Sequence, residues 1–194
     1  MDKNALNDKF INFEKRIKRD AFRNEKRIGD VGYYIFDYDP QYELFARKRI
    51  DEIKTRINNQ NYSFKIQEFD IFKIVFEILK EKNYLQKSFH FEKTKGTEFT
   101  LNAITTVLKL DGSSNLIVKY VKDNYNEDSI IFLTGIGKIY PIVRAHNILN
   151  NLNMDTPTIL FYPGTYSGNN LKLFNTINDA NYYRALTFGT FEIE

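Results

Sequence analysis

The sequence predicts an α/β fold: an open, mostly parallel five-stranded sheet with helices on both faces, Rossmann-like or degenerate P-loop-like. Three observations predict it. Short β-prone runs alternate with helical patterns along the chain. Residues 130–133 and 159–162 are unbroken apolar runs, typical of strands covered on both faces. No repeat, low-complexity tract or linker divides the 194 residues, so we expect a single domain over residues 1–194.

The N-terminal segment predicts an amphipathic helix, because apolar side chains recur at helical spacing up to Ala21 and the pattern stops near residues 28–29. Residues 33–36 then form a short β-prone run. Asp39 is placed to cap a second helix, which has Pro40 at its first position. The apolar face of this second helix comprises Ala46, Ile50, Ile53 and Ile57.

The middle of the chain predicts one strand followed by several helices. Apolar and polar residues alternate over residues 62–66, as expected of a strand buried on one face, and Asp70 can cap the helix that follows. Over residues 80–126 we identify no strand. This stretch instead predicts two further helices separated by the turn at residues 111–113. We therefore expect residues 71–126 to form a helical insert or lid.

The C-terminal part supplies the rest of the sheet. The two apolar runs predict central strands, joined by a helix over residues 139–152. A fifth strand is expected over residues 182–188.

The composition excludes several kinds of site. The chain has no cysteine, which excludes disulfides, thiolate nucleophiles and cysteine-based zinc sites. Its two histidines, His90 and His146, are too few for a histidine-rich metal site. No window approaches the ~18 consecutive apolar residues of a membrane span. We expect a cytoplasmic protein that binds no cofactor or metal and does not contact a membrane.

The excess positive charge lies in the first helix. Residues 1–30 contain nine Lys or Arg and six Asp or Glu, which accounts for the whole net charge of +3. Any nucleic-acid contact would therefore be weak and would rest on this helix. A solvated helix face is the more common reason for such a pattern.

Ligands of open α/β sheets bind beyond the carboxyl ends of the strands, which selects three loops. One, Thr-Gly-Ile-Gly-Lys at residues 134–138, resembles part of a phosphate-binding loop, since Gly135 and Gly137 let backbone N–H groups face an anion. A Walker loop also requires a glycine and a Ser or Thr where this chain has Phe132 and Ile139. Hydrolysis of ATP or GTP is therefore not expected, and the alternative is a tight turn that packs a helix on the sheet.

The other two loops offer polar groups without a catalytic pattern. Asp37 is a better candidate than Asp39, because Asp39 suits capping and alternate side chains of an extended segment point apart. Residues 163–170 combine glycines, hydroxyls, an aromatic ring and amides that suit a ligand or a partner. A serine-hydrolase elbow is unsupported, because no glycine lies two positions before Ser167.

Four ordered segments resemble the BrxB family, a former domain of unknown function found in BREX phage-exclusion systems. They are residues 36–40, 132–152, 160–174 and 181–186, and residues 80–126 match only in character. Several residues match the family pattern as we identify it, whereas Lys138 is not a fixed feature of it. The matching residues are Gly135, Pro141, Arg144, His146, Asn150 and residues 162–164.

The resemblance implies a small, non-catalytic adaptor that contacts other BREX components, above all the phosphatase-like PglZ. The resemblance also implies that a separate methyltransferase carries out methylation in such systems. Other components carry the ATPase and phosphatase-like folds. The alternative is a phosphate-binding, nucleotide-binding or weakly nucleic-acid-binding protein of the same system. We assign no catalytic or metal-binding residue. The candidates for ligand or partner binding are Asp37, Thr134, Gly135, Gly137, Arg144, Tyr162, Gly164, Tyr166 and Asn169.

Overall fold

The computed structural model describes residues 2–19, 22, 33–167, 170–179 and 185–188. The helices are α1 (Lys3–Ile17), η1 (Pro40–Tyr42), α3 (Glu43–Asn58), α4 (Ile71–Glu81), α5 (Leu85–Lys95), α6 (Thr97–Leu108), η2 (Gly112–Ser114), α7 (Leu116–Asn124), η3 (Ile136–Lys138) and α8 (Ala145–Leu149). The strands are β1 (Tyr33–Tyr38), β2 (Lys65–Asp70), β3 (Ser129–Thr134), β4 (Thr158–Tyr166), β5 (Leu171–Leu173), β6 (Ile177–Asp179) and β7 (Ala185–Thr187).

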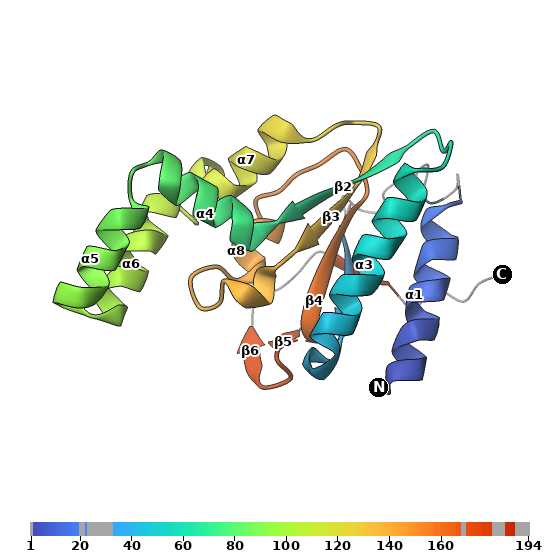
Figure 1. The fold of residues 1–194 in the computed structure, drawn as a ribbon, viewed down its shortest axis with the longest axis horizontal. Coiled ribbons are helices and arrows are strands. Elements are labelled where there is room, and N and C mark those ends of the chain that lie inside the picture. The colour runs from blue at the N-terminus through green and yellow to red at the C-terminus, as the bar shows by residue number, and fades with distance from the viewer. Residues whose placement is uncertain (1, 20–21, 23–32, 168–169, 180–184, 189–194) are drawn as a thin grey trace.

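Five strands form a parallel sheet in the order β2-β3-β4-β1-β7, which confirms the predicted α/β class (Figure 1). The long β4 continues beyond this sheet and pairs antiparallel with β5, which pairs with β6. The sequence did not predict this small antiparallel extension.

The connections give the sheet a topological switch point. The chain leaves β1 toward β2 at one edge, and it leaves β4 toward β7 at the other. Because β1 and β4 are neighbours, the switch lies between them, where α/β sheets hold their ligands.

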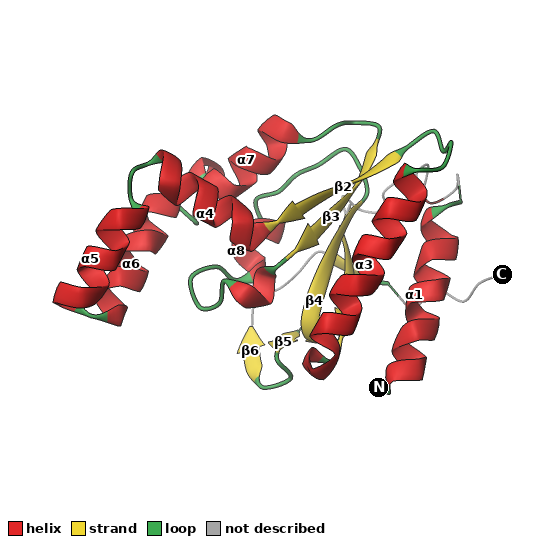
Figure 2. Ribbon diagram, in the orientation of Figure 1, coloured by secondary structure: helices red, strands yellow, loops and turns green. Residues whose placement is uncertain are grey.

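Helices cover both faces of the sheet, and each face has its own core (Figure 2). Side chains alternate along a strand, so Phe132 faces α1 and α3 while Leu133 faces α4, α7 and α8. On the first face, Phe13 of α1 lies 4.7–5.7 Å, ring centroid to centroid, from four other phenylalanines. These are Phe36, Phe132, Phe161 and Phe188.

Both predicted capping residues are confirmed, although Asp39 caps η1 and the α-helix α3 begins only at Glu43. Asp39 accepts a hydrogen bond from the N–H of Gln41 at 3.1 Å, directly before Pro40. Asp70 accepts hydrogen bonds from two backbone N–H groups at the start of α4. The first helix, α1, ends at Ile17, and its predicted end near residues 28–29 lies outside the described residues.

Two boundaries were wrong. The strand predicted over residues 62–66 begins only at Lys65. The helix predicted over residues 139–152 is replaced by a turn and the short α8. The predicted helix is interrupted by Pro141, because proline has no N–H to donate and disfavours helical geometry at the preceding residue. The Tyr140–Pro141 peptide bond is cis.

The predicted helical insert contains α5, which the sequence did not reveal. The buried residue of α5 is Ser88, so the sequence of this helix has no apolar stripe from which the helix could be predicted. With α6 it forms a hairpin, here called the arm (residues 85–108), that projects from the sheet (Figure 1). No helix among the described residues has the length and apolar character needed to cross a membrane.

Glu14 links α1 to α3 and should make stability depend on pH. It accepts two hydrogen bonds from Arg56, at 2.9 and 3.0 Å, and one from Lys18 at 2.6 Å. Burial raises the pKa of Glu14, but these hydrogen bonds and the two positive charges outweigh burial and lower the pKa below its ordinary 4.5.

A lowered pKa means that the ionised carboxylate stabilises the fold above pH 4.5 and that this contribution disappears as the pH falls through the folded-state pKa. We expect Glu14→Gln to lower the free energy of unfolding by about 1 kcal/mol at neutral pH, and by less at acidic pH. Urea unfolding of both proteins at several pH values measures the gap. A gap that stays constant with pH would contradict the role of the ionised group.

Candidate functional site

The carboxyl ends of β1 to β4 meet at one edge of the sheet, as the sequence predicted. At this edge the structure places Asp37, Thr134, Gly135, Tyr162 and the other described candidates. Asn169 lies outside the described residues.

Asp37 is hydrogen-bonded to two other elements at the switch point. One carboxylate oxygen, Oδ1, accepts a hydrogen bond from Lys9 Nζ of α1 at 2.6 Å. The other, Oδ2, accepts the backbone N–H of Tyr166 at 3.1 Å. Lys9 also donates to the backbone carbonyl of Asp37 at 2.6 Å. Asp37 therefore ties α1, β1 and β4 together across the position where this class of sheet holds a ligand.

A cleft beside the switch point contains paired charges. Lys54 Nζ lies 2.5 Å from Glu68 Oε2 and 3.0 Å from Asp51 Oδ1. Burial lowers the pKa of Lys54, but hydrogen bonds to these two carboxylates outweigh it and raise the pKa. Thr134 donates its hydroxyl to Glu68 Oε1 at 2.8 Å. Both oxygens of Glu68 thus have partners, and Lys54 stays protonated.

In the turn at residues 134–138, the reason for the glycine at position 135 is a contact within the chain and not phosphate binding. Gly135 adopts a left-handed conformation with φ of +79°. A Cβ atom there would clash with the Asp70 carboxylate, and Lys138 Nζ lies 2.5 Å from Asp70 Oδ2. A carboxylate therefore lies against the glycine that a phosphate would have to approach, and it already pairs with the lysine. This geometry disfavours anion binding at the turn.

The remaining two candidate glycines permit close packing. A Cβ atom on Gly137 would lie 2.7 Å from Cγ of Pro163 and 3.2 Å from a ring carbon of Phe174. A Cβ atom on Gly164 would clash with the backbone carbonyl of Lys172 on β5. The alternative of a tight turn is thus the better description, although the partner is the β4–β5 ribbon, not a helix.

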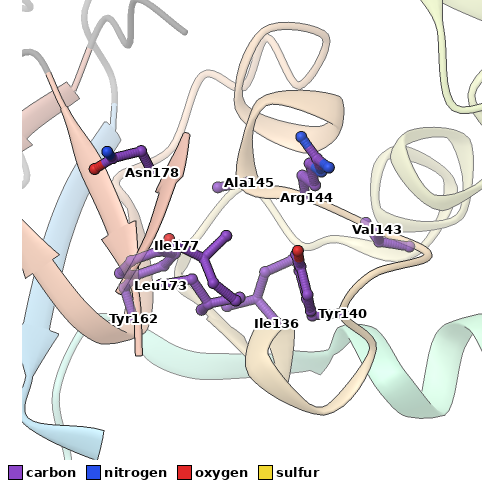
Figure 3. Close-up of a pocket in the computed structure, with 9 residues that line it drawn as sticks. All are labelled: Ile136, Tyr140, Val143, Arg144, Ala145, Tyr162, Leu173, Ile177 and Asn178. Atoms are coloured by element: carbon purple, nitrogen blue, oxygen red, sulfur yellow. The ribbon is translucent and has the colours of Figure 1, made fainter. Parts of the chain in front are cut away.

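Arg144 and Tyr162 line a small, mainly apolar recess on the other side of β4 (Figure 3). Ile136 and Leu173 contribute to its floor, and Tyr140 lies at its side. Arg144 is exposed, and in Figure 3 its guanidinium points away from the floor. Tyr162 is buried. The recess is too small and too apolar to bring the candidate residues together in one reaction centre.

The sequence did not predict a second hydrogen-bonded group at this edge, formed by the buried Tyr38 with Glu43 and Arg47. Tyr38 donates its hydroxyl to Glu43 Oε2 at 2.5 Å, and Arg47 Nε lies 2.6 Å from Glu43 Oε1. Burial, followed by the negative charge of Glu43, raises the pKa of Tyr38 far above its ordinary value, so the phenol stays protonated. Glu43 and Arg47 are one helical turn apart, so the sequence could have predicted their pairing, but not the contact with Tyr38.

Metal binding has no support in the ranges that the structure covers. No group of three or more His, Cys, Asp or Glu side chains in them could hold an ion.

Comparison with known proteins identifies the family. The sequence model described as "BREX protein BrxB" matches residues 67–188, more than half of the chain. The BREX protein BrxB of Bacillus cereus (strain H3081.97) is 44% identical over 184 residues, which cover 93% of this chain and 95% of that protein. The chain belongs to the BrxB family.

A more distant BrxB protein gives the same result. The BREX protein BrxB of Escherichia coli O9:H4 (strain HS) is 32% identical over 185 residues, covering 93% of this chain and 90% of that protein. No solved structure matches the chain significantly. The BrxB family match begins in β2, so it includes the helical insert, the 134–138 turn and the β4–β5 ribbon.

Proposed function

We propose that the protein is a non-catalytic accessory component of a BREX anti-phage defence system, acting in the cytoplasm as a single domain through contacts with other BREX proteins. Family membership supports the link to BREX. The observation that carries the non-catalytic role is the pairing of Asp37 at the switch point, where its two carboxylate oxygens bond to Lys9 and to the backbone of Tyr166. The carboxylate nearest the place where an α/β enzyme binds its reactants is here engaged within the chain.

The charged cleft supports the same proposal. A general base needs a group that can take up a proton near neutral pH, and a nucleophile needs such a base within reach. Glu68 is shared between Lys54 and Thr134, and Asp70 caps α4 and pairs with Lys138. A ligand would have to break these interactions before it could react.

Part of the positive charge of α1 is already engaged in contacts within the chain. Lys9 pairs with Asp37, Lys18 pairs with Glu14, and Arg16 lies 4.7 Å from the ring centroid of Phe188. These cations already stabilise contacts within the chain, which argues against the nucleic-acid alternative. We propose the phosphatase-like PglZ as the main partner, as the family resemblance implies.

Copurification tests the proposal. The tagged chain, co-expressed with the other proteins of its own BREX system, should retain PglZ through affinity and size-exclusion steps at a fixed ratio. Absence of a complex with every component would refute the adaptor role.

Two variants of the charged cleft, Glu68→Gln and Lys138→Ala, test the non-catalytic role. Both should preserve the complex and protection from phage in a plaque assay. Loss of protection by a variant that folds and still binds its partner would instead indicate chemistry in the cleft.

A further inference from the structure

The helical insert exposes more aromatic surface than a solvated helix face requires. Among the described residues, seven large apolar side chains are exposed, and four of them are phenylalanines on the consecutive helices α4, α5 and α6. Phe89 is the most exposed of these rings, at 60%. Single exposed apolar residues are common, but a gathering on one structural unit indicates a contact surface. The four are Phe72, Phe76, Phe89 and Phe99.

Two of these rings have a lysine over them, and the other two have a lysine one helical turn away in sequence. Lys138 Nζ lies 5.6 Å from the ring centroid of Phe72, and Lys95 Nζ lies 4.3 Å from that of Phe99. On α4 and α5 a lysine follows the phenylalanine by one helical turn, which places both on the same side of the helix. These pairs are Phe76 with Lys80 and Phe89 with Lys93.

The arm holds part of this surface away from the sheet (Figure 1). It is braced internally, because the rings of Phe91 on α5 and Phe99 on α6 lie 5.3 Å apart. The buried side of α5 is marked by Ser88, while Phe89 is exposed. An 11-residue helix is only marginally stable in isolation, so α5 depends on these contacts and leaves its outer face available.

We infer that this surface docks a protein partner with an acidic surface and an apolar recess. We call it the lysine–phenylalanine surface: Phe89 and Phe99, with Lys93 and Lys95, all on the arm. The inference rests on the proposed function and specifies where the partner binds. Complementary charge would steer the encounter, and burial of the rings would supply affinity.

Two other occupants fit less well. A second copy of this chain would bring lysine against lysine at the same patch. Nucleic acid requires a concentrated positive field, whereas Glu92 and Glu98 lie among the lysines of the arm. An acidic protein surface that also offers an apolar recess satisfies both parts of the pattern.

The test compares binding of purified wild-type and variant chains to each purified component of the same BREX system. The variant Phe89→Ala, which leaves the Phe91–Phe99 contact in place, should bind its partner at least tenfold more weakly. The matched control is Leu44→Ala, since Leu44 is 79% exposed on α3 and belongs to a different helix layer. It should bind within about twofold of wild type.

A second pair of variants tests the charge. Lys93→Glu/Lys95→Glu should weaken binding severalfold, and the wild-type complex should weaken as salt rises. Lys48→Glu, on the exposed side of α3, is the matched control and should bind the partner as strongly as wild type does. Circular dichroism establishes that each variant is folded.

The outcomes are distinguishable. If wild type binds a component and the arm variants bind equally well, the lysine–phenylalanine surface is refuted while the adaptor role stands. If wild type binds no component, the adaptor role fails and the inference fails with it. If the arm variants lose binding to duplex DNA while retaining every protein complex, the acidic protein partner is refuted in favour of nucleic acid.

Discussion

Phe13→Ala is expected to lower the free energy of unfolding by about 3–5 kcal/mol, the range for removal of a fully buried phenylalanine. Phe13 is 1% exposed and contacts rings contributed by β1, β3, β4 and the residue after β7. Its removal would leave a cavity under α1 that the surrounding rings can fill only in part. Urea unfolding followed by circular dichroism measures the effect.

Two controls separate packing from helix propensity. Phe13→Leu preserves most of the buried volume and should lose clearly less stability. Ile11→Ala on the same helix, where Ile11 is 38% exposed, should change stability by only about 0.5 kcal/mol. Equal losses for Phe13→Ala and Ile11→Ala would contradict the described packing of α1 on the sheet.

Gly135→Ala is expected to lower the free energy of unfolding by about 2–4 kcal/mol. The left-handed backbone alone penalises alanine by about 1–2 kcal/mol. The new methyl group would also displace the Asp70 carboxylate, which caps α4 and pairs with Lys138. Thermal and urea unfolding measure the loss.

An Asp70→Ala background provides the matched control, because it removes the carboxylate that the new methyl group would meet and leaves the left-handed backbone of Gly135 unchanged. In that background Gly135→Ala should cost only the backbone penalty of about 1–2 kcal/mol. An equal loss in both backgrounds would refute the clash.

The sequence predicted those parts of the fold whose signals are local. β3 and β4 were visible because strands buried on both faces give unbroken apolar runs. The caps Asp39 and Asp70 were visible because capping depends on neighbours two or three residues away. The three-residue strands β5 and β6 were missed, since their pairing depends on the end of β4.

The candidate site was less predictable, because its contacts join distant parts of the chain. The pairing of Lys138 with Asp70 spans 68 positions, and that of Asp37 with Lys9 spans 28. The glycine pattern correctly drew attention to the 134–138 turn, but the group that faces Gly135 is a carboxylate from another strand. Composition and spacing cannot reveal that a carboxylate of the chain lies where the glycine pattern suggests a bound anion.

The position of β1 in the sheet has a consequence for the order of folding. Tyr33 pairs with Thr158 on one side and Ala185 on the other, so both neighbours of β1 are far along the chain. Contacts of this kind close long loops and form slowly, whereas the contacts within the helical insert are local. During synthesis, β1 and the aromatic face of α1 must therefore wait until β4 and β7 have been made, and a nascent chain exposes these aromatic side chains until then.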